Sequence, residues 1–530
     1  MAKILKIAAI VVSIAAAIPT GGTSLLAAGL GVSAAAASAI AVGVSVAAGV
    51  IGQLTAKKPA VAGVQTSWTA DPDAPIPIIF GRCIASGDIR YRKQHGNKNK
   101  WDTLVSVLSG CGPIQAIDQT YMEKAPISFS SGVYTIDGHA RIWQRTQLGA
   151  CPEPSYLAPL VGAPPQWTSA HKLSGYAAVL NTFEYDATGD HTLTSTPRFN
   201  WLIRGVKAYD PRLDSSYPGG AGPQRWNDQT TWTYSRNPYI LGLTWAIGWR
   251  QGPDKVRVGG VGMDISGIDV AAYVDAANIA DLHGWTVNGR ATTGDDKWEV
   301  LKSLCQAGGG EPVRHGALLS CFVNAPRVSI ATIGRGDIIG TASVQTAQTF
   351  RDRVNGVTPR YTSEDHFWEQ VPAGTIRNAT FLAADGAERT KTVAYPMVTC
   401  EAGQTPDQAA QLAGYDIVNA REAQPITLPL KLRWLGYRAG DCLTIAPDLT
   451  ELGWLAGRDV VIVKRELDPA TAQVVLTVRT EDPNKHDWAL TRTGTAAPIT
   501  GKTTPAPDVP MSADTTAIKA DSTDRTADGS

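Results

Sequence analysis

Pro75-Ile-Pro-Ile-Ile-Phe-Gly-Arg82 is the stretch that decides the fold class, because it opens a body made of extended segments. Proline removes a backbone donor and is tolerated at strand starts and edges, which suits Pro75 and Pro77. Gly87-Asp-Ile-Arg-Tyr-Arg92 follows with the alternation of a β-strand. These segments predict that the body begins as a β-sheet.

Further extended segments recur along the chain. The predicted strands are residues 103–108, 114–121, 199–209, 426–432, 441–445, 460–465 and 474–479. Gly (52) and Pro (33) are abundant and Trp (15) outnumbers Phe (8), which suits turn-rich β domains. Residues 125–192 are rich in Gly, Pro and Ser and are expected to be irregular. A chain of 530 residues holds several domains, so the expected class is α+β, β-rich and multidomain.

Three helices and one hairpin stand out between these strands. Residues 269–282 and 295–307 both begin with acidic residues and end before glycine or His-Gly. The clearest helix is 406–421, where Thr405 and Gln408 predict a capping box and Pro406 occupies the first turn. Residues 311–323 predict a hairpin.

The N-terminal segment contains no charged residue between Lys6 and Lys57. Apolar runs longer than about 18 residues are often membrane spans, while Lys3 and Lys6 ahead of the first run imitate an export signal. The second run is rich in Ala and Gly, which suits close helix–helix contact. A cleaved signal, a membrane anchor and a helical segment buried in an assembly all remain open.

Charge and cysteine usage exclude some classes of function. Lys+Arg and Asp+Glu are both 48, so a broad nucleic-acid-binding face and specific nucleic-acid recognition are not expected. The seven cysteines are scattered and form neither CxxC nor Cys/His clusters, so no metal site is indicated. Such a set is typical of reduced thiols in a protein made in a cytoplasm.

The sequence presents no convincing catalytic motif. Residues 259–262 and 308–310 are glycine runs without the context of a nucleotide-binding loop, and we interpret them as turns. His366 lies in an acidic stretch, but nothing pairs it with a nucleophile. We therefore expect no enzyme, no catalytic residue, no cofactor and no metal. The tryptophans at 201, 226, 232, 245 and 249 suit either core packing or a sugar-binding groove.

Several short stretches in a fixed order resemble the central tail-tip proteins of long-tailed bacteriophages. This tip attachment, or host specificity, group includes the related hub proteins of gene transfer agents. The likeness spans roughly residues 5–480. The stretches that carry it are the hydrophobic N-terminus, Ile76–Arg82, Gly87–Tyr91, Val107–Ile114, Gly205–Arg212, Trp232–Trp249, Arg353–Val357 with Tyr361, Phe367-Trp368, and the helix Gln408–Arg421.

This resemblance implies a baseplate hub built from tail-tube-like β-barrel domains, with inserted small domains and an N-terminal hydrophobic helical segment. A homotrimer in the tail tip of the virion would close the tail tube and open for genome ejection. Implied partners are the distal tail protein, the tape-measure protein, other tail-tip proteins and a tail fibre. Residues 4–54 would form a plug that contacts the host membrane transiently. Relatives carry further receptor-binding modules, so here a separate fibre is expected to bind the receptor.

Together, these patterns predict six regions. They are a hydrophobic plug (1–58), a first hub β domain (59–124), an irregular insertion (125–195), a mixed α/β hub domain (196–345), a hub β domain with the helix 406–421 (346–490), and a disordered linker or tail (491–530). The alternative function is a membrane-anchored or secreted bacterial surface protein that binds carbohydrate through its Trp-rich region. A cell-wall hydrolase would need a catalytic constellation that the sequence does not show.

Overall fold

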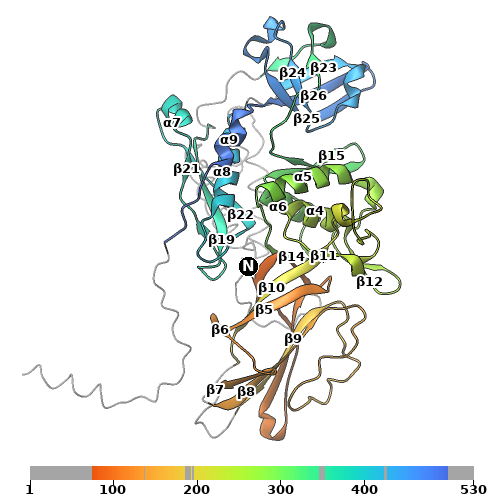
Figure 1. Ribbon diagram of the computed structural model, residues 1–530, viewed down its shortest axis with the longest axis vertical. Coiled ribbons are helices and arrows are strands. Elements are labelled where there is room, and N and C mark those ends of the chain that lie inside the picture. Colours follow the sequence, from red (N-terminus) through yellow and green to blue (C-terminus); the bar gives the residue numbers. More distant parts are fainter. Residues whose placement is uncertain are drawn as a thin grey trace, which may run out of the picture. The chain divides into compact units, whose positions relative to one another are not determined.

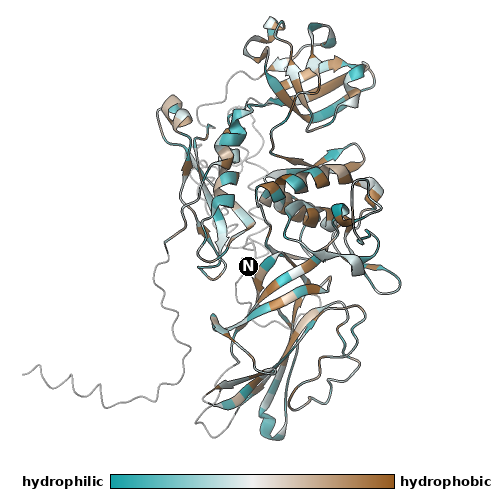
Figure 2. Ribbon diagram, in the orientation of Figure 1, coloured by the Kyte–Doolittle hydropathy of each residue, from teal (hydrophilic) through white to brown (hydrophobic). Residues whose placement is uncertain are grey.

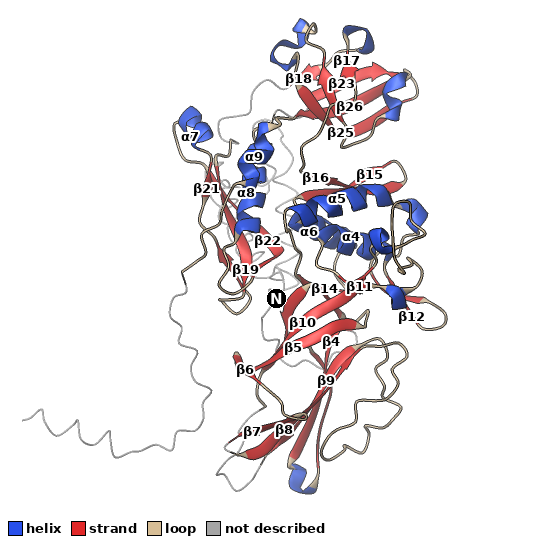
Figure 3. Cartoon of the chain, viewed as in Figure 1, coloured by secondary structure: helices blue, strands red, loops and turns tan. Residues whose placement is uncertain are grey.

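The computed structural model describes residues 74–136, 138–185, 193, 196–344, 353–422 and 426–498. The expected plug at 1–58 and the tail from 499 onward lie outside the described residues. The described part of the protein is β-rich and contains several separate sheets (Figure 3). None of its described helices is long and apolar enough to cross a membrane.

The stretch that opens the body forms two short strands that pair with distant parts of the chain (Figure 1). Strand β1 (Pro77–Phe80) pairs antiparallel with β14 (Gly289–Thr292), and β2 (Arg82–Ala85) pairs with β10 (Phe199–Ala208). Strand β10 is the centre of a five-stranded sheet. Its remaining strands are β5 (Ile114–Met122), β6 (Ala125–Ile127) and β11 (Thr233–Tyr234).

A second five-stranded antiparallel sheet contains much of the region expected to be irregular. Its spatial order is β3 (Asp88–His95), β4 (Trp101–Ser109), β9 (Ala177–Glu184), β8 (His139–Leu148) and β7 (Val133–Ile136). The expectation of irregular structure at 125–192 is therefore wrong for these strands. Strand β9 lies between β4 and β8 and buries seven of its eight residues. A strand covered on both faces lacks the alternation that reveals a half-exposed one.

Three helices form the next part of the body, and the sequence predicted two of them. The helices expected at 269–282 and 295–307 are α5 (Val270–Leu282), which Asp269 caps, and α6 (Lys297–Ala307), which Asp296 caps. Helix α4 (Pro238–Ile247) was not predicted, because all ten of its residues are buried and it has no polar face. Two hairpins accompany the helices: β12 (Trp249–Gln251) with β13 (Val256–Gly259), and β15 (Gly310–His315) with β16 (Leu318–Val323).

A six-stranded sheet collects segments from both sides of residue 345. Its order is β17 (Thr332–Ile333), β24 (Cys442–Ile445), β25 (Asp459–Asp468), β26 (Gln473–Thr480), β23 (Ile426–Lys431) and β18 (Ser343–Val344). Apolar residues alternate with polar ones along its strands (Figure 2). The apolar face of this sheet encloses its own hydrophobic cluster, which includes Leu428, Ile462 and Leu476.

A four-stranded sheet with helices completes the described chain. Its strands are β19 (Gly356–Ser363), β20 (Glu369–Pro372), β21 (Ile376–Arg377) and β22 (Thr390–Cys400), and its helices are α7 (Ala379–Asp385), α8 (Asp407–Asn419) and α9 (Asn484–Leu490). The predicted capping box of α8 is wrong. Gln408 instead donates to the carbonyls of Thr286 and Ala307, so a tertiary contact replaces the local cap.

A close backbone approach in the first part of the body involves β1, β2 and β10. The Gly205 amide donates to the Gly81 carbonyl over 2.7 Å. A Cβ atom on Gly205 would lie 2.0 Å from the Ile79 carbonyl oxygen, a distance that real Cβ atoms do not adopt. Glycine is therefore required at position 205. We call this contact the Gly205 junction.

We predict that Gly205→Ala destabilises the protein by roughly 3 kcal/mol, because the new methyl group forces a backbone shift in a closely packed place. Urea unfolding measures this change. Gly336→Ala is the matched control, since no atom lies within 4 Å of the position of its Cβ. An equal effect of both substitutions would contradict the prediction.

Candidate functional site

The residues that resemble catalytic groups are occupied by structural contacts. His366 lies in the turn between β19 and β20, and its Nδ1 is 2.9 Å from the Ser363 hydroxyl. The neighbouring Glu364 carboxylate accepts two hydrogen bonds from Arg82. In the described part of the chain, no three His, Cys, Asp or Glu side chains gather closely enough to hold a metal ion. The acidic stretch around His366 therefore forms a turn and an ion pair.

The glycine runs form turns, as the sequence predicted. Gly260 and Gly262 follow β13 with φ angles of +76° and +82°. Gly309, between α6 and β15, has φ +70°, and the preceding Gly308 carbonyl accepts a hydrogen bond from the buried Tyr239 hydroxyl. Neither run presents a free array of backbone amides beyond a strand end, as a phosphate-binding loop would.

The tryptophans of the Trp-rich region belong mainly to the core. Trp201, Trp232, Trp245 and Trp249 are at most 2% exposed. Trp245 contacts Trp249 edge to face, with ring centroids 6.3 Å apart, and donates its indole proton to the Lys297 carbonyl. A sugar-binding groove needs exposed ring faces. These four side chains therefore supply core packing rather than a carbohydrate site.

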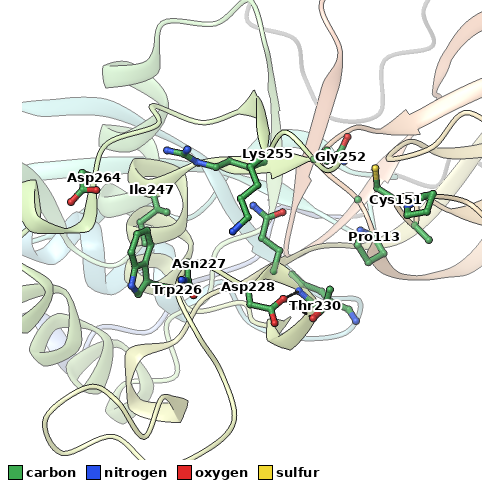
Figure 4. Close-up of a pocket in the computed structure, with 18 residues that line it drawn as sticks. Pro113, Cys151, Trp226, Asn227, Asp228, Thr230, Ile247, Gly252, Lys255 and Asp264 are labelled. Atoms are coloured by element: carbon green, nitrogen blue, oxygen red, sulfur yellow. Dashed lines mark hydrogen bonds between the residues drawn. The ribbon is translucent and has the colours of Figure 1, made fainter.

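A hollow with a volume of about 900 Å³ lies beside β12, the Trp226–Thr230 turn and the Cys151 loop (Figure 4). Asp228 accepts hydrogen bonds from the amide and hydroxyl of Thr230, which hold its pKa below the usual range. Asp264 is held by Ser266 in the same manner. Both carboxylates therefore stabilise their own turns.

The stretches that carry the family resemblance hold the body together. The Gly110 amide donates to the Pro77 carbonyl over 2.7 Å, next to the Gly205 junction. In the short 3-10 helix Pro211–Leu213 that follows β10, Arg212 forms an ion pair with Asp210 and another with Asp281 of α5. The side chains of these stretches thus connect the sheets to the helices, and their role in the described structure is packing and cross-linking.

The six-stranded sheet and the segments that connect its strands carry most of the large apolar side chains that reach solvent in the described chain. Five of them lie along the β24–β25 region and are defined here as the apolar rim: Val328 (86% exposed), Ile330 (59%), Leu435 (37%), Val463 (45%) and Leu467 (47%). Contiguous exposed apolar surface is typical of protein–protein contact. The rim is the strongest candidate for a functional surface in the described chain.

Hydrogen bonds place two of the rim residues beside β24 and β25. The Ile330 amide donates to the Cys442 carbonyl, the first residue of β24, and Cys442 is paired with Val461 of β25. Arg465, which also lies in β25, donates a hydrogen bond to the Leu435 carbonyl. Strand β24 covers β25 only from Asp459 to Val461, so the rest of this edge has no strand partner among the described residues. The β-bulge at Val463 marks the start of the uncovered part.

The sequence predicted the strands of this region but not the rim. Val463 falls within the predicted strand 460–465, and its exposure follows from the bulge and the open edge, which depend on pairing. Val328 and Ile330 precede a strand of only two residues, so no periodicity marked them. The signal available in the sequence was the pair of apolar residues Val328 and Ile330 in a segment without periodicity.

Comparison with known proteins gives no match to a described protein family and none to a curated sequence. Among solved structures, the chain is similar to one in the virion of a native gene transfer agent particle, with 15% identity and a TM-score of 0.49 over 88% of this chain and 98% of that one. A tail protein from Neisseria meningitidis MC58 shows 12% identity and a TM-score of 0.28, over 78% and 98% of the two chains. The 43 kDa tail protein of prophage MuSo2 from Shewanella oneidensis shows 9% identity and a TM-score of 0.27, over 78% of this chain and 94% of that one.

We predict that Cys151 is alkylated far faster than the buried thiols of the native protein. Cys151 is exposed, whereas burial raises the pKa of Cys83 and of Cys111 to about 12. A rise of about 3 units from the usual thiol pKa leaves about a thousandfold less thiolate, the reactive form. Iodoacetamide labelling followed by mass spectrometry measures this difference. In denaturant all three thiols should react equally, and equal labelling of the native protein would refute the prediction.

Proposed function

We propose that this protein is a non-enzymatic structural component of a bacteriophage-type tail, located in the virion at the central hub of the tail tip. The observation that carries the proposal is the apolar rim on an open sheet edge. A surface of this kind serves assembly, because leaving large apolar groups in water is unfavourable unless another protein covers them. The ordered sequence resemblance and the structural use of its residues support the same reading.

The proposed occupant of the rim is a second copy of this chain, within a homotrimer. The formal net charge is zero, so copies do not repel one another through their overall charge. The rim lies on one side of the six-stranded sheet, while β18 ends its other side. Contacts between two different edges are heterologous, and such contacts close into rings when the rotation permits. A ring of three copies would cover each rim once.

In this proposal the ring closes the tail tube and opens when the genome is ejected. Tail-tube-like barrels would then be completed by the curved six-stranded sheet and its neighbours in the assembly. The distal tail protein, the tape-measure protein, other tail-tip proteins and a fibre are the proposed partners. The proposed plug at residues 4–54 would be covered by sister copies and would contact the host membrane during infection.

The alternative of a carbohydrate-binding surface protein gains no support from the described residues. Its candidate groove depended on the tryptophans, and four of the five are core side chains. The hollow of Figure 4 contains only one of the five, Trp226, beside two carboxylates that stabilise their own turns. We therefore propose a single function.

We predict that Val328→Asp combined with Val463→Asp weakens self-association by at least about tenfold, because two carboxylates would have to be buried without partners. Light scattering of the full chain across a concentration series measures this change. The unsubstituted chain should reach three times the monomer mass.

Val256→Asp is the matched control, since Val256 is also an exposed valine (60%) but lies on the β12–β13 hairpin, far from the rim in sequence and in another sheet. The control should associate like the unsubstituted chain. A monomeric unsubstituted chain, or equal weakening in both variants, would overturn the proposal.

A further inference from the structure

The turn between β19 and β20 reaches across to a different sheet. It comprises residues 364–368 and connects Ser363 to its strand partner Glu369. Trp368 is 2% exposed and packs in a small cluster with Ile84 of β2 and Leu202 of β10. This turn therefore covers the face of the β2–β10–β5 sheet that points away from the main core.

Aromatic contacts and an ion pair hold the turn on that sheet, and the Lys124 ammonium lies over the Phe367 ring and 3.5 Å from the Glu369 carboxylate. Phe367 and Trp368 meet Tyr121 of β5 edge to face, with ring centroids 5.5 and 5.9 Å apart. Arg82 donates two hydrogen bonds to the Glu364 carboxylate, over 2.8 and 2.9 Å. The two side chains of this pair are 26% and 13% exposed, so water reaches the edge of the contact. Bidentate charge-assisted pairs are the stronger class of hydrogen bond.

The same turn also carries unfavourable features. Phe367 and Trp368 have φ angles of +54° and +57°, the left-handed region that is costly for two successive bulky residues. The Trp368 indole proton has no hydrogen-bond acceptor among the described residues. The attached state of the turn therefore includes stored strain as well as attraction.

An unsatisfied polar group lies in the sheet beneath the turn. Asn200 of β10 is paired with Tyr121 and is fully buried, and neither its amide oxygen nor its nitrogen has a partner in the described structure. Side chains alternate between the two faces of a strand, so Asn200 shares the face of Leu202, which Trp368 covers. A buried amide without partners is unfavourable, and exposure to water would relieve it.

We propose that residues 364–368 form a releasable latch on the β2–β10–β5 sheet, closed by the Arg82–Glu364 pair. Release breaks the partly exposed Arg82–Glu364 pair and the exposed contacts of Lys124, relaxes two left-handed residues, and hydrates Asn200 and the Trp368 indole. These gains offset part of the cost of exposing the aromatic rings. The latch rests on contacts within one chain and holds whether or not the proposed hub function is correct.

Cleavage by chymotrypsin after Phe367 or Trp368 tests the latch, because the protease acts on the open form. We expect Glu364→Gln in the full chain to accelerate cleavage there by about tenfold or more, since it removes the charge that Arg82 binds. Cleavage after the exposed Trp454 serves as an internal reference. Global unfolding would accelerate both cleavages, whereas latch release accelerates only the first.

Glu388→Gln is the matched control, because it removes a similar pair, with Arg377 at 2.8 Å, from the same four-stranded sheet and its helix. It should leave cleavage at Phe367 and Trp368 unchanged. Equal cleavage rates at these sites in the Glu364→Gln and Glu388→Gln variants would overturn the proposal.

Asn200→Leu tests the contribution of the buried amide. It keeps a similar volume but removes the group that gains from hydration, so cleavage at the latch should slow by about tenfold. Unchanged or faster cleavage in a variant that keeps the circular dichroism spectrum of the unsubstituted chain would overturn this part of the proposal. If Asn200→Leu does not fold, the comparison of the two glutamate variants decides the question.

Discussion

The close backbone approach at the Gly205 junction is the constraint on which the rest of the first body depends. Only a residue without Cβ lets β10 pass so near the Ile79 carbonyl. That approach lets β10 pair with β2 and β5 while β1 turns away to pair with β14. One side of the sheet then faces the core, and the other side is left for Trp368 to cover.

Apolar–polar alternation and capping residues predicted the helices and strands that have a polar side or a local sequence signal. They did not predict the elements whose structure depends on tertiary contacts. Helices α5 and α6 were found because acidic caps begin them, whereas α4 and β9 are buried on all sides and show no period. The capping box of α8 was locally plausible, but Gln408 binds carbonyls more than a hundred residues away. Local sequence does not reveal distant acceptors that compete with the local cap for a side chain such as Gln408.

The candidate surface was harder to predict than the fold. Exposure of the rim depends on where β24 stops covering β25, which is a property of pairing rather than of composition. The abundance of tryptophan is compatible with a binding groove as well as with a core. Only the packing of these side chains distinguishes the two interpretations. Composition indicated that large aromatic groups matter here, and the structure assigns four of the five to the interior.

Two sets of ion pairs, one around Lys485 and one between Arg82 and Glu364, differ in how easily they can separate. Lys485 of α9 binds Glu422 and Glu481, and all three side chains are at most 7% exposed. Breaking that cluster leaves uncompensated buried charges, which is strongly unfavourable. The Arg82–Glu364 pair can instead exchange its partners for water. The turn at 364–368 can therefore separate more easily than α8, α9 and the end of β26, which Lys485 joins.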